Sequence, residues 1–468
     1  MEPFADTAQL QESLQGVVKL RHGSELHLLI PQMFRGELVD RFVYTSVLGG
    51  TAKLRHLCSQ IIRSAALTHG IWCDSIHAFY QANAVSRGRS IVVPAFNIRG
   101  LTYSTIRSIF RVAQKTDSGP FIIEISPAEM SHTQQRADEI AACVLGAALR
   151  ENYSGPVFLQ GDHFRLDPRR CQSDLQTETS RLQALILDGM NNGFLNFDID
   201  ATIATGPDTE SHSGQNPSYL DLAADLCTFI RHHQPESVSI ALGVEFANLR
   251  GVLRHSQTLV SDFSRFKESL DRCGFPDHIT KFNIHLDAVS GNNSGSAHTA
   301  KPQIPNVSAD ECAILREFAE SMRAAYGVCG LEVHSSTAIP EPYLPLLPSS
   351  GVVEAHLGTR LQDVVFDHPR FPIGLTEEIH SYLETHCSLE SRSGLPQEQF
   401  YYLARKKAWG PFKKAICSLD ERTKLAILQD VEKEITMNFE KLGAVSQRKR
   451  MDEIYPVPAP SLAVKPRF

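Results

Sequence analysis

Three histidines stand at the ends of apolar segments in this chain. LQGDHF carries Asp162 and His163, FNIH ends on His285, and GLEVH ends on His334. Imidazoles and carboxylates are costly to bury unless they are paired, bound to a metal or used in a reaction. Three imidazoles with an open fourth position are typical of catalytic zinc, each nitrogen lying about 2.0–2.1 Å from the metal. We therefore expect His163, His285 and His334 to bind one divalent ion, although a lone histidine in such a place is more often hydrogen-bonded in the core.

Eight short apolar segments must position these side chains. They cover residues 90–97, 120–126, 156–163, 194–200, 237–245, 281–287, 330–335 and 351–358. Each is followed by a stretch of helical periodicity, as in Ile106, Ile109, Phe110 and Ala113. Strands that are buried on both faces and alternate with helices favour an α/β fold of the closed (β/α)₈ TIM barrel type. An open, doubly wound sheet split by insertions is the alternative.

Asp162 and His163 raise a question of geometry. Successive side chains of a regular strand face opposite ways, so both can serve one site only if the strand has ended at that point. Gly161 would permit the necessary turn of the backbone. The alternative is that Asp162 caps the next helix or forms an Asx-turn.

The barrel has helical extensions at both ends. LRHLCSQIIRSAALTHG reads as an amphipathic helix before the first strand, and a charged helical stretch begins at DERTKLAILQ, well after the last. We expect a helical N-terminal extension over residues 1–72, the barrel over 73–388, and a helical C-terminal extension with a loosely ordered, Pro-rich tail over 389–468.

Composition limits the functional classes. The 46 Lys and Arg residues against 53 Asp and Glu residues give a net charge of −7, which argues against binding nucleic acid or anionic membranes. The ten cysteines include no CxxC pair and read as reduced thiols. No apolar stretch reaches the roughly 18 residues of a membrane span. We expect a cytoplasmic protein acting on a small molecule.

Motifs in a fixed order resemble the class II, metal-dependent fructose-bisphosphate aldolases over about residues 73–365. These are RSIVVPAFN, GDH, GFLNFDIDAT, GVEFANLRG, FNIH, EVHSSTAIP and GVVEAHLGTRLQ. GDHF, DIDAT, HSST and the helical tail are closer to the tagatose-bisphosphate aldolase subunits called non-catalytic, which share the barrel. The resemblance implies Zn²⁺ at His163, His285 and His334, polarising a ketose carbonyl and stabilising the enediolate formed on carbon–carbon cleavage.

The resemblance also implies roles for nearby residues. Asp162 matches the general acid/base that moves the proton of the reacting hydroxyl. Glu245 matches a catalytic glutamate near the metal, with a salt bridge to Arg250 or Arg254 as the alternative. Asp200 matches a carboxylate that orients a metal-bound imidazole, with a helix cap as the alternative. Substrate contacts are implied for two further residues, Asn97 and Ser126.

The phosphate-binding segments depart from the family pattern. The glycine-rich HGGSG turn is HSSTA here, in which Ser335 and Ser336 offer hydroxyls in place of bare amides. The last strand keeps Thr359, replaces the substrate-binding Asn with His356, and adds Arg360, whose fork suits phosphate or carboxylate. The mouth of the barrel is therefore rebuilt, and the sugar stays open.

Three functions are compatible with these residues. The first is a zinc-dependent lyase that cleaves or forms a carbon–carbon bond in a ketose phosphate, with dihydroxyacetone phosphate as one product. The second is a non-catalytic barrel that stabilises a partner aldolase. The third is a metal-dependent sugar-phosphate epimerase that uses the same enediolate. Family habit suggests a homo-oligomer, a dimer or larger.

Overall fold

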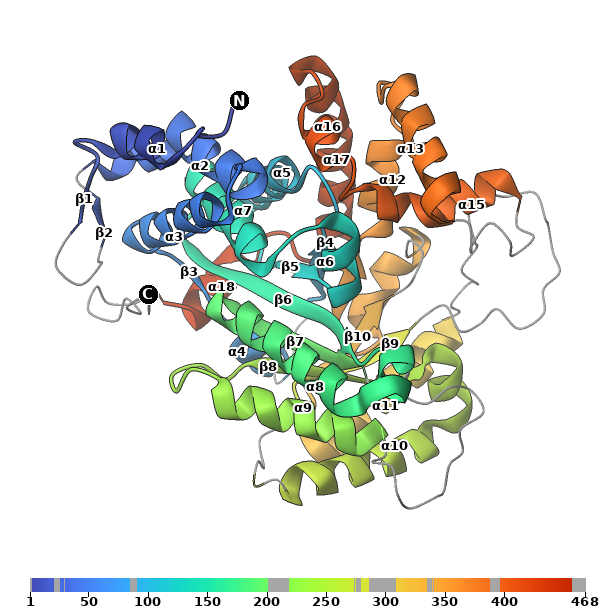
Figure 1. Ribbon diagram of the computed structural model, residues 1–468. Helices are drawn as coiled ribbons and strands as arrows, with labels where there is room; N and C mark the ends of the chain where they lie inside the picture. The colour runs from blue at the N-terminus through green and yellow to red at the C-terminus, as the bar shows by residue number, and fades with distance from the viewer. Residues whose placement is uncertain are drawn as a thin grey trace.

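A closed barrel of eight parallel strands forms the centre of the molecule (Figure 1). The computed structural model describes residues 2–20, 26–28, 30–84, 91–200, 219–272, 274, 279–285, 309–334, 339, 341–387 and 396–456. The barrel strands are β4 (Val93–Asn97), β5 (Ile122–Ile125), β6 (Gly155–Arg165), β7 (Phe194–Asp200), β8 (Ala241–Asn248), β9 (Lys281–His285), β10 (Gly330–His334) and β11 (Val352–Leu357). All eight predicted strands are confirmed.

The strands follow one another around the barrel in chain order. Pairing of β11 with β4 and of β6 with β7 completes the circle, which excludes the open, doubly wound sheet. Strand residues such as those of β4, β7 and β11 are buried throughout, because interior side chains fill one face and helices cover the other. Parallel order brings every carboxyl end to the same rim, as the predicted site requires.

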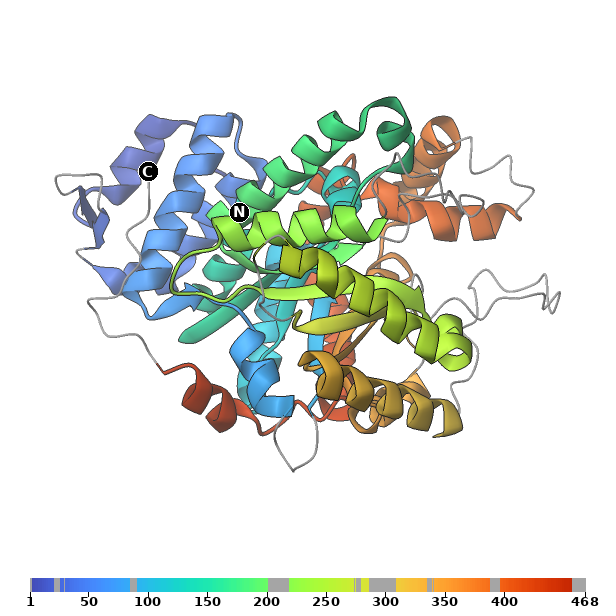
Figure 2. The same cartoon turned by 90° about the horizontal axis from the view of Figure 1, so that it is seen from below.

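Helices alternate with the strands and cover the barrel. They are α5 (Thr102–Lys115), α6 (Pro127–Thr133), α7 (Ala137–Arg150), α8 (Pro168–Asn191), α9 (Tyr219–His233), α10 (Leu249–Arg272), α11 (Ala309–Tyr326) and α12 (Thr359–Phe366), with the 3₁₀ segment η3 (Glu341–Ser349) between β10 and β11. Figure 2 shows the green-to-gold helices α8 to α11 over the outside of the strands. The predicted apolar stripe of α5 is buried against the barrel. Among the described residues, no helix has both the length and the apolar content needed to cross a membrane.

The N-terminal segment is helical with a little added strand. Its elements are α1 (Thr7–Leu14), β1 (Val18–Leu20), β2 (Leu26–Leu28), η1 (Pro31–Arg35), α2 (Glu37–Leu48), α3 (Ala52–Thr68), β3 (Ile71–Cys73) and α4 (His77–Ala84). Helices α2 and α3 pack on α7, and β3 pairs with the first residues of β6. Tyr80 of α4 reaches the barrel interior, where its hydroxyl donates a hydrogen bond to Glu354.

The C-terminal segment runs beside the barrel in orange and red (Figure 1). Its elements are α13 (Ile373–His386), α15 (Gln397–Ala404), η4 (Arg405–Ala408), α16 (Lys413–Cys417), α17 (Glu421–Lys441) and α18 (Arg448–Ile454). Helix α17 packs on α5 and α12, so the charged helix predicted there is confirmed and belongs to the wall of the barrel. The Pro-rich tail, residues 457–468, lies outside the described residues.

Strand β6 brings Asp162 and His163 to one side by a local irregularity, although it does not end there as a regular strand would have to. It continues to Arg165, and its pairing with β7 shifts register between Gly161 and Phe164. His163 itself has a left-handed backbone, with φ of 45°. Gly161 is required by packing rather than by a turn of the backbone. A Cβ there would lie 2.5 Å from Phe164 Cε2 and 2.7 Å from Phe197 Cδ1.

Gly161→Ala is expected to destabilise the protein by about 1–3 kcal/mol, because the added methyl group overpacks this aromatic contact. Gly189→Ala is the matched control, since its Cβ would meet the same Phe197 ring at an ordinary 3.4 Å in helix α8. Helix propensity predicts a neutral or stabilising change there, up to about 1 kcal/mol. Urea unfolding of both variants measures the difference. Equal stability of the two would contradict the packing assigned to Gly161.

Candidate active site

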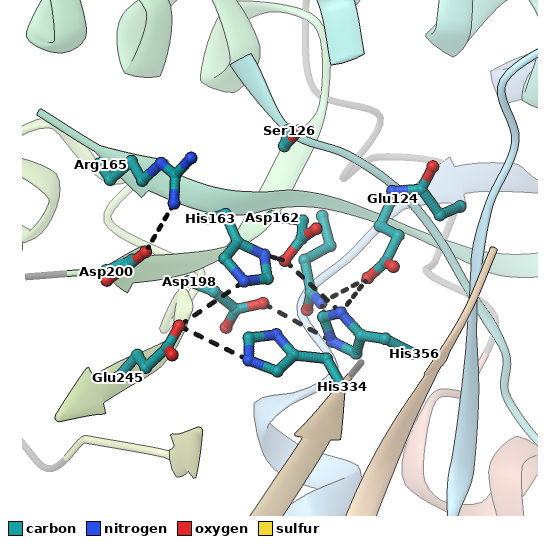
Figure 3. Close-up of polar contacts among 12 residues, drawn as sticks. Glu124, Ser126, Asp162, His163, Arg165, Asp198, Asp200, Glu245, His334 and His356 are labelled. Carbon is teal, nitrogen blue, oxygen red and sulfur yellow. Dashed lines mark hydrogen bonds and ion pairs between the residues drawn. The ribbon is translucent and has the colours of Figure 1, made fainter. Parts of the chain in front are cut away.

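Two imidazoles and a carboxylate meet at the rim of the barrel (Figure 3). The rings of His163 and His334 stack, with centroids 4.2 Å apart and planes 11° apart. Glu245 Oε2 lies 3.6 Å from Nε2 of His163 and 3.6 Å from Nε2 of His334. These residues come from β6, β10 and β8, so three separate strand ends build the cluster.

The cluster fits a divalent metal ion. One donor atom from each of His163, Glu245 and His334 lies within 4.8 Å of the other two. Glu245 Oε2 is buried and accepts no hydrogen bond from any described residue. Imidazole nitrogens with carboxylate oxygen are a common zinc donor set. His285 is paired in register with His334 at the end of β9, and its side chain lies outside the described residues.

Asp162 holds the second nitrogen of His163. His163 Nδ1 donates to Asp162 Oδ1 at 2.6 Å, which leaves Nε2 facing Glu245 and His334. A carboxylate behind an imidazole fixes which nitrogen is presented to a metal. Burial lowers the pKa of His163, but Asp162 and then Glu245 outweigh it and raise that pKa to about 10. Burial raises the pKa of Asp162, but His163 and His356 hold it well below its ordinary value.

Beneath the rim, Lys281 is enclosed by carboxylates. Its Nζ lies 2.6 Å from Glu332 Oε2, 2.6 Å from Glu354 Oε1 and 3.1 Å from Asp198 Oδ1, and the side chain is 0% exposed. Gln160 Oε1 accepts a further hydrogen bond from it at 2.9 Å. Burial lowers the pKa of Lys281, but the three carboxylates raise it well above its ordinary value. The lysine is therefore a fixed charge, unsuited to forming a Schiff base.

His356 stands between this buried layer and the rim. Its Nε2 lies 2.8 Å from Glu354 Oε1 and 2.9 Å from Glu332 Oε1, and its Nδ1 lies 3.1 Å from Glu124 Oε2 and 3.4 Å from Asp162 Oδ1. Burial lowers the pKa of His356, but these carboxylates raise it well above its ordinary value. His356 is thus a cation with a donor on each side of its ring.

Two other donor sets have metal-binding spacing, and both contain Glu332 and His356. They are Asp162, Glu332, His334 and His356, and Asp198, Glu332, Glu354 and His356. A metal ligand must be deprotonated. Glu332, which both sets share, already pairs with Lys281 and His356, whereas Glu245 Oε2 accepts no hydrogen bond from a described residue, so the cluster of His163, Glu245 and His334 is the better candidate.

A cavity of about 540 Å³ opens above the cluster. Seven predicted site residues line it, namely Asn97, Ser126, Asp162, His163, His334, His356 and Thr359. Four arginines that we did not predict line it as well, namely Arg99, Arg165, Arg170 and Arg181. The cavity therefore combines imidazoles and carboxylates at its base with guanidinium groups along its sides, as an anionic substrate would require.

Asn97 and Ser126 are held by one carboxylate, Glu129. Asn97 Nδ2 donates to Glu129 Oε2 at 2.6 Å, and the Ser126 hydroxyl donates to the same oxygen at 2.9 Å. Ser126 also caps α6, with Glu129 completing a capping box. Burial raises the pKa of Glu129, but Arg99 and these hydrogen bonds lower it below its ordinary value. A structural role for Asn97 and Ser126 thus accompanies their position at the cavity.

The structure does not bring every predicted residue to the cavity. Arg360 is exposed and donates from Nε to Glu434 of α17 at 3.0 Å, because it follows Thr359 on α12 and points to the outer side of that helix. Asp200 lies 3.7 Å from Arg165. Ser335 and Ser336 lie outside the described residues, as do the side chains of Arg250 and Arg254.

The alternation of side chains along the strands could have predicted the buried residues Glu124, Glu332 and Glu354, which the sequence analysis did not identify. Residues two positions apart on a strand share a face. Each strand-end residue therefore has an inward neighbour, as Glu332 precedes His334, Glu354 precedes His356 and Glu124 precedes Ser126. Applying this rule backwards from the rim would have found the buried layer.

Comparisons with known proteins support the fold. No protein-family model and no curated protein matches the sequence. A structure described as a probable tagatose 6-phosphate kinase from Sinorhizobium meliloti 1021 is 15% identical, with a TM-score of 0.50 over 80% of this chain and 96% of that one. A fructuronate-tagaturonate epimerase from Cohnella laeviribosi is 11% identical, with a TM-score of 0.49 over 92% and 90%. A fructose-bisphosphate aldolase from Campylobacter jejuni is 15% identical, with a TM-score of 0.42 over 79% and 93%. At this identity the likeness to the first of these structures shows the barrel fold and says nothing of the reaction.

Lys281→Met is expected to destabilise the protein by about 3–5 kcal/mol at pH 8, because it leaves buried carboxylates without their cation. Burial and Glu332 already raise the pKa of Asp198 well above its ordinary value, although Lys281 lowers it. A carboxyl with a raised folded pKa favours folding at low pH and loses that contribution as pH rises. The loss in free energy of unfolding relative to wild type should therefore be smaller at pH 5 than at pH 8.

Lys433→Met is the control for this experiment. Lys433 pairs with Asp430 on the surface, with 79% of its side chain exposed, so its loss should cost at most about 1 kcal/mol. Denaturant unfolding of both variants at pH 5 and pH 8 measures the contrast. A deficit for Lys281→Met as small as the control's, or one independent of pH, would contradict the buried network.

Proposed function

We propose that this protein is a metal-dependent lyase of the aldol type, acting on a ketose phosphate with dihydroxyacetone phosphate as one product. The observation that carries the proposal is the cluster of His163, Glu245 and His334 at the base of a cavity flanked by guanidinium groups. Buried imidazoles and carboxylates cost stability unless they serve a purpose. A barrel that only stabilised a partner would have no physical need of them.

His163, His334 and His285 would hold Zn²⁺, with Glu245 beside them. When bound, the cation supplies Lewis acidity, which polarises a carbonyl and offsets the negative charge that develops on the substrate. Asp162 keeps His163 in the tautomer that presents Nε2. Removing any of these imidazoles would lower metal affinity before it changed any proton transfer.

Proton transfer is assigned to Asp162 and substrate orientation to His356. The low pKa of Asp162 keeps its carboxylate ionised, as a base must be to take the proton from the hydroxyl next to the breaking bond. Both ring nitrogens of His356 face carboxylates, so the ring would act on an anionic substrate through its positive charge at the cavity. Its carboxylate partners fix the plane of that ring.

Epimerisation is the second candidate, and one observation favours it. Glu245 and Asp162 flank His163, and their pKa values are displaced in opposite directions. Burial and Asp200 raise that of Glu245 well above its ordinary value, whereas Asp162 is held low. Paired carboxyl groups with separated pKa values suit removal of a proton and its return.

Metal removal and product analysis test the proposal. The chelated protein should lose activity on a panel of ketose phosphates and regain it with Zn²⁺. Release of a triose phosphate supports cleavage, whereas an isomeric ketose supports epimerisation. His163→Ala should abolish zinc binding by the full chain, with His233→Ala on the surface of α9 as the control. Full zinc occupancy in His163→Ala, or turnover that survives chelation, would contradict the assignment.

Asp162→Asn should retain zinc at saturation and lose turnover by roughly 10²–10⁴-fold, as expected for a general acid/base. The amide still accepts from His163 Nδ1 through its carbonyl oxygen but cannot take a proton. Steady-state turnover and zinc affinity are measured on the same preparation. Unchanged turnover with weaker zinc affinity would assign Asp162 to orienting His163 alone.

A further inference from the structure

Trp409 links the C-terminal segment to the cavity. Its side chain is buried between η4 and α16, and its Nε1 donates to Gln362 Oε1 on α12 at 3.1 Å. The same oxygen accepts from Arg99 Nη1 at 3.4 Å. One amide oxygen therefore connects an indole outside the barrel to a guanidinium that lines the cavity.

Arg99 continues the connection to the predicted substrate contacts. Its Nε and Nη2 both lie 2.9 Å from Glu129 Oε1, and Glu129 Oε2 holds Asn97 and Ser126. A guanidinium has five N–H donors. The contacts with described residues account for one N–H on each nitrogen, which leaves two N–H groups of this cavity-lining residue for a further partner.

The loop that carries Arg99 is fixed from two sides. Any Cβ at Gly100 would overlap the Trp409 ring, so the ring packs directly on the backbone next to Arg99. On the other side, Gln135 Nε2 donates to the carbonyl of Ile98 at 3.1 Å. The position of Arg99 therefore depends on both the barrel and the C-terminal segment.

The C-terminal segment also holds the helices on either side of the cavity. The amide of Gly410 donates to the carbonyl of His132 in α6 at 3.0 Å. Arg405 forms ion pairs with Asp363 and Asp367 at α12 and the residue that follows it. Segment 405–410 thus bridges α6 and α12, and residues of both helices line the cavity.

We infer that Arg99 binds the anionic group of the substrate, and that Trp409 and Gln362 are positioning residues that aim it. The inference rests on the proposed function for the identity of that group, a phosphate. Gly358 lies beside the guanidinium, where a Cβ would come 3.4 Å from Arg99 Nη2 and 2.8 Å from Asn97 Cβ. Glycine there keeps open the approach to Arg99, and the C-terminal segment becomes part of the substrate-binding site.

Binding of inorganic phosphate to the full chain tests this inference by calorimetry, without any need for turnover. Arg99→Gln should weaken binding by roughly 10- to 100-fold, as expected for charged hydrogen bonds. Trp409→Phe keeps an aromatic ring at this position but loses the indole N–H, and should weaken phosphate binding by roughly 2- to 10-fold. With a phosphorylated substrate, Trp409→Phe should raise KM by the same factor and leave kcat unchanged.

The controls separate this inference from a general loss of stability and from the proposed reaction. Trp72→Phe removes an indole hydrogen bond to Asp74 at 2.8 Å, beside β3, and should leave phosphate affinity unchanged. Gln362→Met breaks the same connection if Trp409→Phe does not fold. Wild-type protein without saturable phosphate binding, or a folded Trp409→Phe or Gln362→Met with wild-type affinity, would overturn the inference. A different outcome is a protein that binds zinc, binds phosphate and loses that phosphate binding in Arg99→Gln, yet converts no ketose phosphate. That combination would refute the proposed reaction and leave the role of Arg99 standing.

Discussion

The ammonium group of Lys281 lies at the centre of the barrel, and the carboxylates around it fix the geometry of everything above. Glu332 and Glu354 each contact Lys281 on one side and His356 on the other. His356 in turn faces Asp162, whose hydrogen bond orients His163. Position is therefore transmitted from the interior to the rim through ion pairs in a region without solvent, where such contacts are strong and unpaired groups are expensive.

The buried charged residues beneath the rim include more carboxylates than cations. Glu124, Asp162, Asp198, Glu332 and Glu354 surround two cations, Lys281 and His356. The raised pKa values of Glu124 and Asp198, caused first by burial, reflect the imbalance. The proposed divalent ion beside Glu245 would offset part of this excess negative charge.

The sequence predicted the barrel well because doubly buried strands have a plain signature, and it predicted the rim because parallel strands end together. Asp162, His163, Glu245 and His334 do lie at this rim, and their roles stay predictions. The interior charges, such as Lys281, Glu332 and Glu354, were not predicted because they precede the last residue of their strands, and the predicted site contained only residues at the strand ends. Trp409 had no signal at all, since its contact with Gly100 joins segments about 300 residues apart. Arg360 was misplaced because one residue of rotation on α12 decides whether a side chain faces the cavity or α17.

The order in which these parts leave the ribosome has a consequence for synthesis. Chains emerge from the N-terminus at roughly 5–20 residues per second. Strand β4 waits for β11 before the barrel can close, and the amides of Val92 and Gly119 pair with the carbonyls of Leu442 and Ala444, beyond the end of α17. A nascent chain therefore exposes unpaired strand edges and buried charges until residues 442–444 have emerged. Translation products truncated before residues 442–444 would therefore be targets for chaperones and proteases.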